Sequence, residues 1–257
     1  MKYAIMSDAH ANPRALTTAL EDAAKFGCRK YALLGDITGY SYDVRTTLKT
    51  VREKFDIVLM GNHDSACVGL EPSWEVMAIS NYDIDRAQRE QLEEEEVAWI
   101  REREYIHVGR GFVMAHGDFT NPKAWNYIHS TETAVQNFFS RTERLMFCGH
   151  THHATLWTLT EREVEVDEFD EALSRPALKP ETMFACRLKE DGRYIVNVGS
   201  VGYPRNDLCS VYVIYDDETR RLAYRRLPFD FKGYTQGMID RKIKLPLWLC
   251  DLLQDVH

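Results

Sequence analysis

The sequence lacks the features of a membrane protein and of a disulfide-stabilised secreted domain. Among its 257 residues no apolar run approaches the roughly 18 residues that a membrane-spanning helix needs. The chain reaches polar residues too soon after its start for a signal peptide. None of the six cysteines forms a Cys-x-x-Cys pair, which favours buried, reduced thiols. We therefore expect a cytoplasmic protein with no membrane partner.

Positive charge is also scarce. The chain has 32 lysines and arginines but 40 acidic residues, which gives a formal net charge of −8. Two acidic stretches, residues 90–104 and 161–171, carry this excess. A long nucleic-acid footprint needs clustered lysine and arginine, so we expect no such partner. A small phosphorylated substrate remains compatible if another group supplies positive charge.

The chain is long enough to bury a large core, and 44% of its residues are apolar. It contains no internal repeat and no low-complexity linker, which predicts a single domain over residues 1–257. Apolar runs at residues 3–6, 31–34 and 56–60 predict strands, and helical spacing separates them. A βαβαβ order of this kind indicates a parallel sheet covered on both faces.

The later part of the chain is more varied. The parallel strand–helix order resumes with predicted strands at 112–115 and 145–148 and a helix near 132–139. Mostly strands follow from 155 to 227, which fits a second, largely antiparallel sheet packed on the first. The charged segment 66–104 predicts a helical cap insertion, with Ile84, Leu92, Val97 and Ile100 buried. A solvated helix pair is the alternative. Residues 161–180 predict a mobile acidic loop or hairpin, and 245–253 a short helix.

We expect the cap insertion at 66–104 to lie beside the functional site, because it directly follows a polar block at the end of a predicted strand. It would form one wall of a substrate cleft or a homodimer contact, and contribute no metal ligand. Its glutamates should face away from the site, since they would repel an anionic substrate.

Five short polar blocks each follow an apolar strand. The blocks are Asp8-x-His10, Gly35-Asp36, Gly61-Asn62-His63-Asp64, His116-Gly117 and Gly149-His150-Thr151-His152. Parallel strands deliver such residues to the carboxyl edge of a sheet, where ligands bind in open α/β folds. Each block alone is compatible with an ordinary turn, but five in this setting predict a functional site.

The blocks supply mixed imidazole, carboxylate and amide groups, which suit divalent Mn, Fe, Zn, Co or Ni. The candidate ligands are Asp8, His10, Asp36, Asn62, His116, His150 and His152. Seven ligands exceed the four of a tetrahedral site, whereas two ions that share one carboxylate would use all of them. Two ions about 3.5–4 Å apart clamp the attacking and leaving oxygens of an in-line displacement.

The five blocks resemble the calcineurin-like metallophosphoesterase superfamily in order and spacing. The closer resemblance is to its prokaryotic branch of small predicted phosphodiesterases. That branch shares the stretch from Gly35 to Tyr40 and the stretch Asn197-Val198-Gly199-Ser200-Val201-Gly202-Tyr203-Pro204-Arg205. The resemblance extends to about residue 253. It implies an α/β fold that forms a four-layer αββα sandwich, with two mixed β-sheets flanked by helices and the site at the sheet edges.

The resemblance also implies roles for the site residues. One metal would take Asp8, His10 and His152, the other would take Asn62, His116 and His150, and Asp36 would bridge them. His63 matches a catalytic histidine near the leaving oxygen, a general acid or phosphate contact. Gly39 and Tyr40 stand where the protein phosphatases of the superfamily have Asp and Arg, so such a phosphatase is not expected. The acid partner of His63 stays unidentified.

Two further residues are candidates for substrate binding. Arg205 would grip a phosphate oxygen, with a plain surface arginine as the alternative. Tyr40 would stack on a base, with simple packing as the alternative. Ser200 and Gly202 are expected to shape a loop near the metals.

Together these features predict a dinuclear metal-dependent phosphoesterase. It would hydrolyse a small phosphodiester or phosphoanhydride through a metal-bound hydroxide, with a dinucleoside polyphosphate or a cyclic nucleotide as the candidate substrate. Two divalent ions would reconcile an acidic protein with an anionic substrate. The alternatives are a phosphomonoesterase and a non-catalytic metal-bound protein-interaction scaffold. The filled ligand positions argue against the scaffold, and a homodimer is left open.

Overall fold

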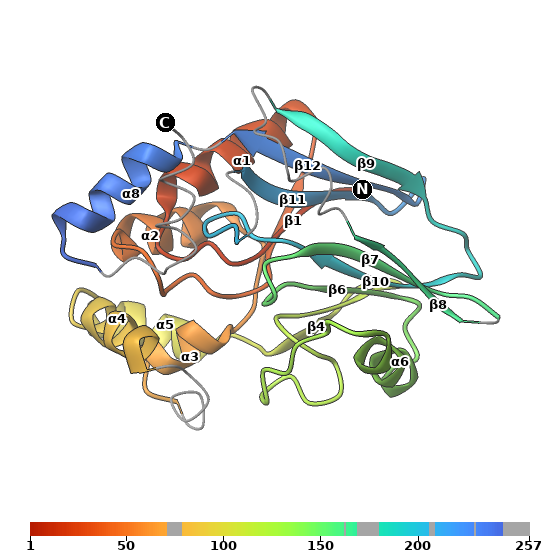
Figure 1. The fold of residues 1–257 in the computed structure, drawn as a ribbon, viewed down its shortest axis with the longest axis horizontal. Coiled ribbons are helices and arrows are strands. Elements are labelled where there is room, and N and C mark those ends of the chain that lie inside the picture. Colours follow the sequence, from red (N-terminus) through yellow and green to blue (C-terminus); the bar gives the residue numbers. More distant parts are fainter. Residues whose placement is uncertain (71–78, 162, 169–179, 206–208, 229, 244–257) are drawn as a thin grey trace.

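The computed structural model describes residues 1–70, 79–161, 163–168, 180–205, 209–228 and 230–243. Two six-stranded sheets stack on one another, and helices cover their outer faces (Figure 1). The first sheet has the order β3 (Ile57–Val58), β2 (Lys30–Leu33), β1 (Lys2–Met6), β11 (Cys209–Asp216), β12 (Arg221–Pro228) and β9 (Glu181–Arg187). The second has the order β4 (Ile106–Val108), β5 (Val113–Ala115), β6 (Leu145–Cys148), β10 (Arg193–Val198), β7 (Ala154–Leu159) and β8 (Val164–Glu168).

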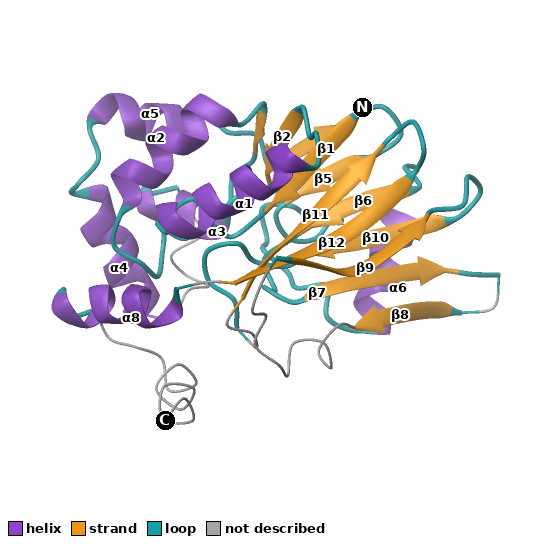
Figure 2. Cartoon of the chain, turned by 90° about the horizontal axis from the view of Figure 1, so that it is seen from above, coloured by secondary structure: helices purple, strands orange, loops and turns teal. Residues whose placement is uncertain are grey.

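Seven named helices accompany the sheets in the described residues. They are α1 (Pro13–Lys25), α2 (Val44–Lys54), α3 (Asn62–Cys67), α4 (Ile79–Arg89), α5 (Glu94–Arg101), α6 (Thr131–Ser140) and α8 (Phe231–Asp240). Helix α1 lies over the first sheet and α6 over the second, while α2 to α5 and α8 gather at one end of the strands (Figures 1 and 2). None of the described helices is long and apolar enough to cross a membrane.

Successive residues of a strand point to opposite faces of its sheet, so each strand contributes side chains to two different apolar clusters. Ile5 of β1 and Phe147 of β6 belong to the cluster between the sheets. Met6 of β1 belongs to the cluster under α1 and α2, and Met146 of β6 to the cluster under α6. The predicted αββα sandwich is therefore confirmed.

The division of strands between the sheets differs from the expected one. Strands β5 and β6 leave the first parallel group and pair within the second sheet, where β6 and β10 are also parallel. The late strand β11 instead pairs antiparallel with β1 in the first sheet. Each sheet therefore combines parallel and antiparallel strands, which sequence periodicity does not reveal because pairing partners are distant in the chain.

The segment predicted as a helical cap contains α4 and α5, with residues 71–78 outside the described part. The segment begins soon after β3. Its far end comes back beside that strand, because Met60 N donates to Glu104 O at 2.8 Å. Leu92, Val97 and Ile100 are buried as expected, but Ile84 is only half-buried. The reason is that α4 turns a polar face inward instead.

Most glutamates that the structure describes in this segment face outward, as expected, whereas the Glu96 side chain is only 16% exposed. Glu94 and Glu95 have side chains that are 83% and 80% exposed. Glu95 pairs with Arg52 of α2 at 2.8 Å, so part of the acidic run is balanced by the neighbouring helix.

Two other expectations are only partly met within the described residues. Of the acidic segment 161–180, Val164–Glu168 is not a loop but strand β8, which pairs antiparallel with β7 as in the hairpin alternative. Residues 169–179 and the helix expected at 245–253 lie outside the described part. Helix α8 was not expected from the sequence, because Gly233 and Gly237 lower its helix propensity.

A buried ion pair connects α1 to the first sheet. Asp22 accepts bonds of 2.8 Å from both Nε and Nη2 of Arg225 on β12, and a third of 2.8 Å from the Tyr212 hydroxyl on β11. Burial alone would raise the pKa of Asp22, but these donors lower it. The carboxylate thus fixes the position of the helix over two strands.

We expect Asp22→Asn to lower the free energy of unfolding by about 3 kcal/mol, because it leaves the Arg225 charge buried without a counter-ion. Urea unfolding at neutral pH measures this. The matched control is Glu95→Gln, which removes an exposed pair worth about 0–1 kcal/mol. Because the native pKa of Asp22 is lowered, its contribution is lost as the pH falls below about 4, and the two proteins should then converge. Equal stability at neutral pH would show that the pair contributes nothing.

Candidate metal centre

The five polar blocks meet where the two sheets end on the same side. Blocks after β1, β2 and β3 come from the first sheet, and blocks after β5 and β6 come from the second. Within the first sheet, Asp8 N donates to Gly35 O at 3.1 Å and His10 N donates to Asp36 O at 2.9 Å. Across the sheets, His150 N donates to Asp8 Oδ2 at 3.1 Å. One site is therefore assembled from both sheets.

The backbone of this site is strained. Five non-glycine residues have left-handed φ angles between 45° and 68°, namely Asp8, His10, Asp36, His150 and His152. Such conformations cost about 1–3 kcal/mol each and persist only where the surrounding structure imposes them. Strain of this kind is concentrated at functional sites.

Two glycines allow the blocks to approach closely. A Cβ on Gly61 would lie 2.1 Å from Asp36 Oδ1, and one on Gly39 would lie 2.4 Å from His63 Nδ1. Gly39 also has a φ of 91°, which side-chain-bearing residues rarely adopt. Any larger residue at either position would displace a site carboxylate or imidazole.

The first group of candidate ligands consists of Asp8, His10 and His152. His152 Nε2 lies 3.2 Å from Asp8 Oδ1 and 3.2 Å from His10 Nε2. His10 Nε2 lies 3.7 Å from Asp8 Oδ1. These three ligand atoms are close enough together to hold one metal ion.

The second group consists of Asp36, His116 and His150, with Asn62 beside them. His116 Nε2 lies 3.1 Å from Asn62 Oδ1, 3.1 Å from His150 Nδ1 and 3.3 Å from Asp36 Oδ2. Asp36, His116 and His150 again present a set of ligand atoms suited to one ion.

Asp36 connects the two groups. Its Oδ2 lies 3.3 Å from His116 Nε2 in the second group and 3.7 Å from His10 Nε2 in the first. Its Oδ1 accepts the backbone N–H of His63 at 2.9 Å, which fixes the carboxylate. The structure thus brings all seven sequence-predicted ligand residues together around this carboxylate.

Backbone carbonyls orient the four histidines of these groups. The contacts are His10 Nδ1 to Thr38 O at 2.7 Å, His152 Nδ1 to Tyr203 O at 2.6 Å, His116 Nδ1 to Leu34 O at 3.1 Å and His150 Nε2 to Trp125 O at 2.8 Å. Each ring donates its outer N–H, so in the neutral ring the inner nitrogen carries a lone pair that faces the centre.

The arrangement fits metal ions. Facing lone pairs 3.1–3.2 Å apart repel unless a cation lies near them. Asp8 Oδ1 is buried and has no hydrogen-bond donor among the described residues. Two carboxylates are also buried here without a lysine or arginine partner in the described part of the chain. The imidazole, carboxylate and amide donors suit divalent transition metals.

The buried charges perturb the titration of the site. Burial lowers the pKa of His10 to about 4. Burial would also lower the pKa of His116, but the Asp36 carboxylate raises it to about 9. Burial would raise the pKa of Asp36, yet the neighbouring His116 and His63 hold it well below its usual value. The centre therefore stabilises positive charge, either as protons or as metal ions.

The acid partner of His63 is Asp85, which the sequence did not identify. Asp85 comes from α4 of the cap insertion, and its Oδ2 lies 2.9 Å from His63 Nδ1. Both side chains are buried. Burial would lower the pKa of His63, but the carboxylates of Asp85 and Asp36 raise it to about 9. The insertion therefore supplies part of the site.

A second residue of α4 strengthens this contact. Gln88 Oε1 accepts a bond of 2.8 Å from Gly39 N, and Gln88 Nε2 donates to Ser41 O at 2.9 Å. Asp85 and Gln88 lie three residues apart, so they share one face of the helix. In the sequence an acid and an amide at this spacing are also typical of a solvated helix face, so only their burial in the structure shows that this face contributes to the site.

Asp64, which follows His63 in the chain, has a different role. Its Oδ1 accepts the backbone N–H groups of Ile37 and Thr38 at 2.9 and 3.0 Å. Its Oδ2 accepts Gly61 N at 3.1 Å. Asp64 therefore connects the second and third polar blocks, and Asp85 is the carboxylate that contacts the His63 ring.

Arg205 and Tyr40 lie at the rim of the centre. Arg205 Nη2 donates to the Tyr40 hydroxyl at 3.4 Å. The Tyr40 ring lies 4.6 Å from the rings of His10 and His63 and stacks on Tyr203 at 4.2 Å. This packing favours a structural role for the ring, while its hydroxyl and Arg205 remain next to the site.

The glycine-containing stretch 197–205 packs against the first polar block, beside the candidate metal centre. Ser200 Oγ donates to Asp8 O at 3.0 Å and accepts Tyr203 N at 2.9 Å. A Cβ on Gly202 would lie 1.8 Å from Ala9 O. Both residues therefore shape the loop near the centre, as the sequence predicts.

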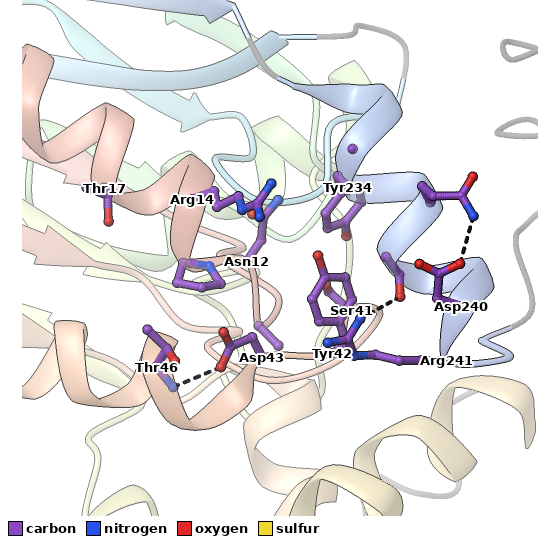
Figure 3. A pocket seen from close by; sticks show the side chains of 15 residues that line it. Asn12, Arg14, Thr17, Ser41, Tyr42, Asp43, Thr46, Tyr234, Asp240 and Arg241 are labelled. Carbon is purple, nitrogen blue, oxygen red and sulfur yellow. Dashed lines mark hydrogen bonds between the residues drawn. The ribbon is translucent and has the colours of Figure 1, made fainter.

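Two pockets lie near the site. One of about 590 Å³ includes Asn62 and His150 in its wall and extends toward α6. Another of about 840 Å³ lies between α1, α2 and α8 and contains none of the candidate ligands (Figure 3). Two of its charged residues serve the fold, since Asp43 caps α2 and the Arg241 guanidinium lies 4.2 Å from the centre of the Tyr42 ring.

Comparisons with known proteins agree with this geometry. The sequence profile of the calcineurin-like phosphoesterase superfamily domain matches residues 1–220. Uncharacterized protein MJ0912 of Methanocaldococcus jannaschii is 26% identical over 263 residues, which cover 97% of this chain and 96% of that protein. The chain belongs to the calcineurin-like phosphoesterase superfamily, and it is a metallophosphoesterase.

Solved structures share the fold along nearly the whole chain. The metallophosphoesterase from Sphaerobacter thermophilus is 29% identical, with a TM-score of 0.75 and coverage of 97% of this chain and 96% of that chain. Hypothetical protein PH1004 from Pyrococcus horikoshii is 16% identical, with a TM-score of 0.70 and coverage of 98% and 97%. The second likeness concerns the fold alone.

The central position of Asp36 predicts that Asp36→Asn weakens binding at both groups of ligands. An amide keeps an oxygen for the His63 N–H but loses the charge. Metal affinity should fall by more than the roughly 10–100-fold that loss of an outer partner costs. Metal analysis after dialysis measures this, with circular dichroism to verify folding. The control is Asp191→Asn, in the turn at the opposite end of β10. Unchanged metal content would contradict a shared carboxylate.

Proposed function

We propose that this metallophosphoesterase hydrolyses a small phosphodiester or phosphoanhydride at a dinuclear metal centre. Asp8, His10 and His152 would hold one divalent ion, and Asn62, His116 and His150 the other. Asp36 would contact both. The observation that carries the proposal is the pair of histidine–carboxylate groups that share Asp36. When bound, two divalent ions supply positive charge for a phosphate group and lower the pKa of water for attack.

The chain's own residues prepare this site for an anionic substrate. Backbone carbonyls fix the imidazole tautomers, so the inner nitrogens need not reorganise during the reaction. The site is buried beneath its rim, which strengthens electrostatic interactions inside it. Arg205 would bind a phosphate oxygen that lies beyond the centre. An arginine at that position favours a substrate with a second charged group.

His63 would donate a proton to the leaving oxygen. The hydrogen bond from its Nδ1 to Asp85 fixes the ring, so Nε2 is the nitrogen left for substrate. Asp85 would act as a positioning residue because it holds the imidazole and balances its positive charge. This assignment gives the cap insertion a direct part in the reaction.

The substrate class is tested with the manganese-loaded protein. We expect bis-p-nitrophenyl phosphate to be hydrolysed with a higher kcat/KM than p-nitrophenyl phosphate, because the former is a diester. A dinucleoside polyphosphate or a cyclic nucleotide should be hydrolysed by the same protein and not after treatment with a chelator. Preference for the monoester would instead indicate a phosphomonoesterase. A metal-loaded protein without turnover on any phosphoester would indicate a binding scaffold.

Variants of His63 and Asp85 test the proposed acid. His63→Ala should keep its metal but lose about 10²–10⁴-fold in kcat on a nucleoside leaving group, and less on p-nitrophenolate, which needs no proton. Asp85→Asn should show a smaller loss with the same dependence on the leaving group and little change in KM. The double variant should equal His63→Ala, because the two residues act as a unit.

Three outcomes would contradict the assignment of His63 as a proton donor positioned by Asp85. Loss of metal from His63→Ala would make this histidine a ligand, a role its closeness to His10 and Asp36 allows. Equal losses for good and poor leaving groups would exclude proton donation. Additive losses in the double variant would show that Asp85 acts independently of His63.

A further inference from the structure

The turn that carries Tyr40 is strained. Tyr40 has a φ of 49°, in the left-handed region that residues with side chains rarely adopt. Ser41 N donates to Gly39 O at 2.6 Å, so the chain reverses within three residues. A three-residue turn with a positive φ at its central residue is rare, and it persists only where neighbouring groups hold it in place.

Gln88 of the cap insertion holds both ends of this turn. Its Oε1 accepts Gly39 N at 2.8 Å, while its Nε2 donates to Ser41 O at 2.9 Å and to Gly39 O at 3.3 Å. Gln88 is 2% exposed, so water does not compete for these bonds. One buried amide therefore satisfies backbone groups on either side of Tyr40.

The turn determines where the Tyr40 hydroxyl lies. The Tyr40 ring is held between the rings of His10 and His63 on one side and the stacked ring of Tyr203 on the other. Its hydroxyl then accepts a bond of 3.4 Å from Nη2 of Arg205. A change in the backbone at Tyr40 would therefore move the group that Arg205 contacts.

Arg205 depends on this hydroxyl for its orientation. The part of the chain that the structure describes gives Arg205 no carboxylate partner, and the Tyr40 hydroxyl is its side-chain hydrogen-bond partner there. The guanidinium interacts electrostatically with Asp8 and His152 of the first ligand group. A long side chain that is already oriented loses less entropy when it binds a phosphate oxygen.

One face of α4 reaches both the proposed acid and this turn. Asp85 contacts Nδ1 of His63, and Gln88 contacts the backbone around Tyr40. The two contacts are neighbours, since a Cβ on Gly39 would lie 2.4 Å from His63 Nδ1. The spacing of three residues between Asp85 and Gln88 puts both side chains on the same side of the helix.

We propose that Gln88 is a positioning residue for substrate binding, which holds the strained turn at Tyr40 and so orients Arg205 toward a phosphate oxygen of the substrate. This inference rests on the proposed function and gives α4 a second part in it. Asp85 acts through the proton donor and therefore on kcat. Gln88 acts through Arg205 on binding, and therefore on KM.

Gln88→Met tests this assignment, because methionine fills a similar volume but has no amide. With the manganese-loaded protein and bis-p-nitrophenyl phosphate, we expect KM to rise about tenfold and kcat to change little. Arg205→Ala should raise KM at least as much, within the range of about 10–100-fold for a hydrogen bond to a charged group. The matched control is Gln91→Met, an exposed glutamine just after α4, which should behave as the wild type does.

Double variants separate positioning from a general loss of stability. If Gln88 acts through Arg205, Gln88→Met combined with Arg205→Ala should have the KM of Arg205→Ala alone. Gln88→Met combined with Asp85→Asn should instead show both the rise in KM and the loss in kcat. Manganese content and circular dichroism are measured for every variant. If Gln88→Met does not fold, Gln88→Asn replaces it, because its amide is one methylene too short to reach both ends of the turn.

Binding of inorganic phosphate gives a measurement that is independent of turnover. Calorimetry on the same manganese-loaded proteins should show weaker phosphate binding for Gln88→Met and for Arg205→Ala, with no further loss in the double variant. This pattern in a protein that hydrolyses no phosphoester would support the positioning role of Gln88 and reject the proposed reaction.

Several results would overturn the positioning role while the proposed function stands. One is an unchanged KM and an unchanged phosphate affinity in a folded Gln88 or Arg205 variant that still hydrolyses the diester. Another is a loss confined to kcat, which would mean that Gln88 acts through His63. Additive effects of Gln88→Met and Arg205→Ala on KM would show that the two residues act independently.

Discussion

Two carboxylates buried without a lysine or arginine partner in the described part of the chain determine how this end of the molecule is built. Asp8 and Asp36 are 0% and 1% exposed, and burial of such groups is strongly unfavourable unless they are compensated. Backbone N–H groups and four oriented imidazoles provide part of that compensation. The strained backbone, the close glycine contacts and the convergence of two sheets all serve to bring these donors within reach. Two divalent metal ions would supply the remaining positive charge that these buried carboxylates need.

The polar blocks were predictable because each is short and directly follows its own strand. Their chemistry is visible in adjacent residues such as Asn62 and His63, and strand ends bring such blocks together. The sheet to which each strand belongs was less accessible. The partners β1 and β11 are about two hundred residues apart in sequence, and an apolar strand does not specify a distant neighbour. The fold class was therefore easier to infer than the sheet order.

Asp85 shows why part of the site escaped prediction. It reaches His63 only because α4 packs on α3, a contact that depends on the whole insertion. In sequence it resembles any acidic residue on an exposed helix. Gln88 is equally inconspicuous, although it bonds to both ends of the loop that carries Tyr40. A buried polar helix face is recognised only when the surface opposite it is known.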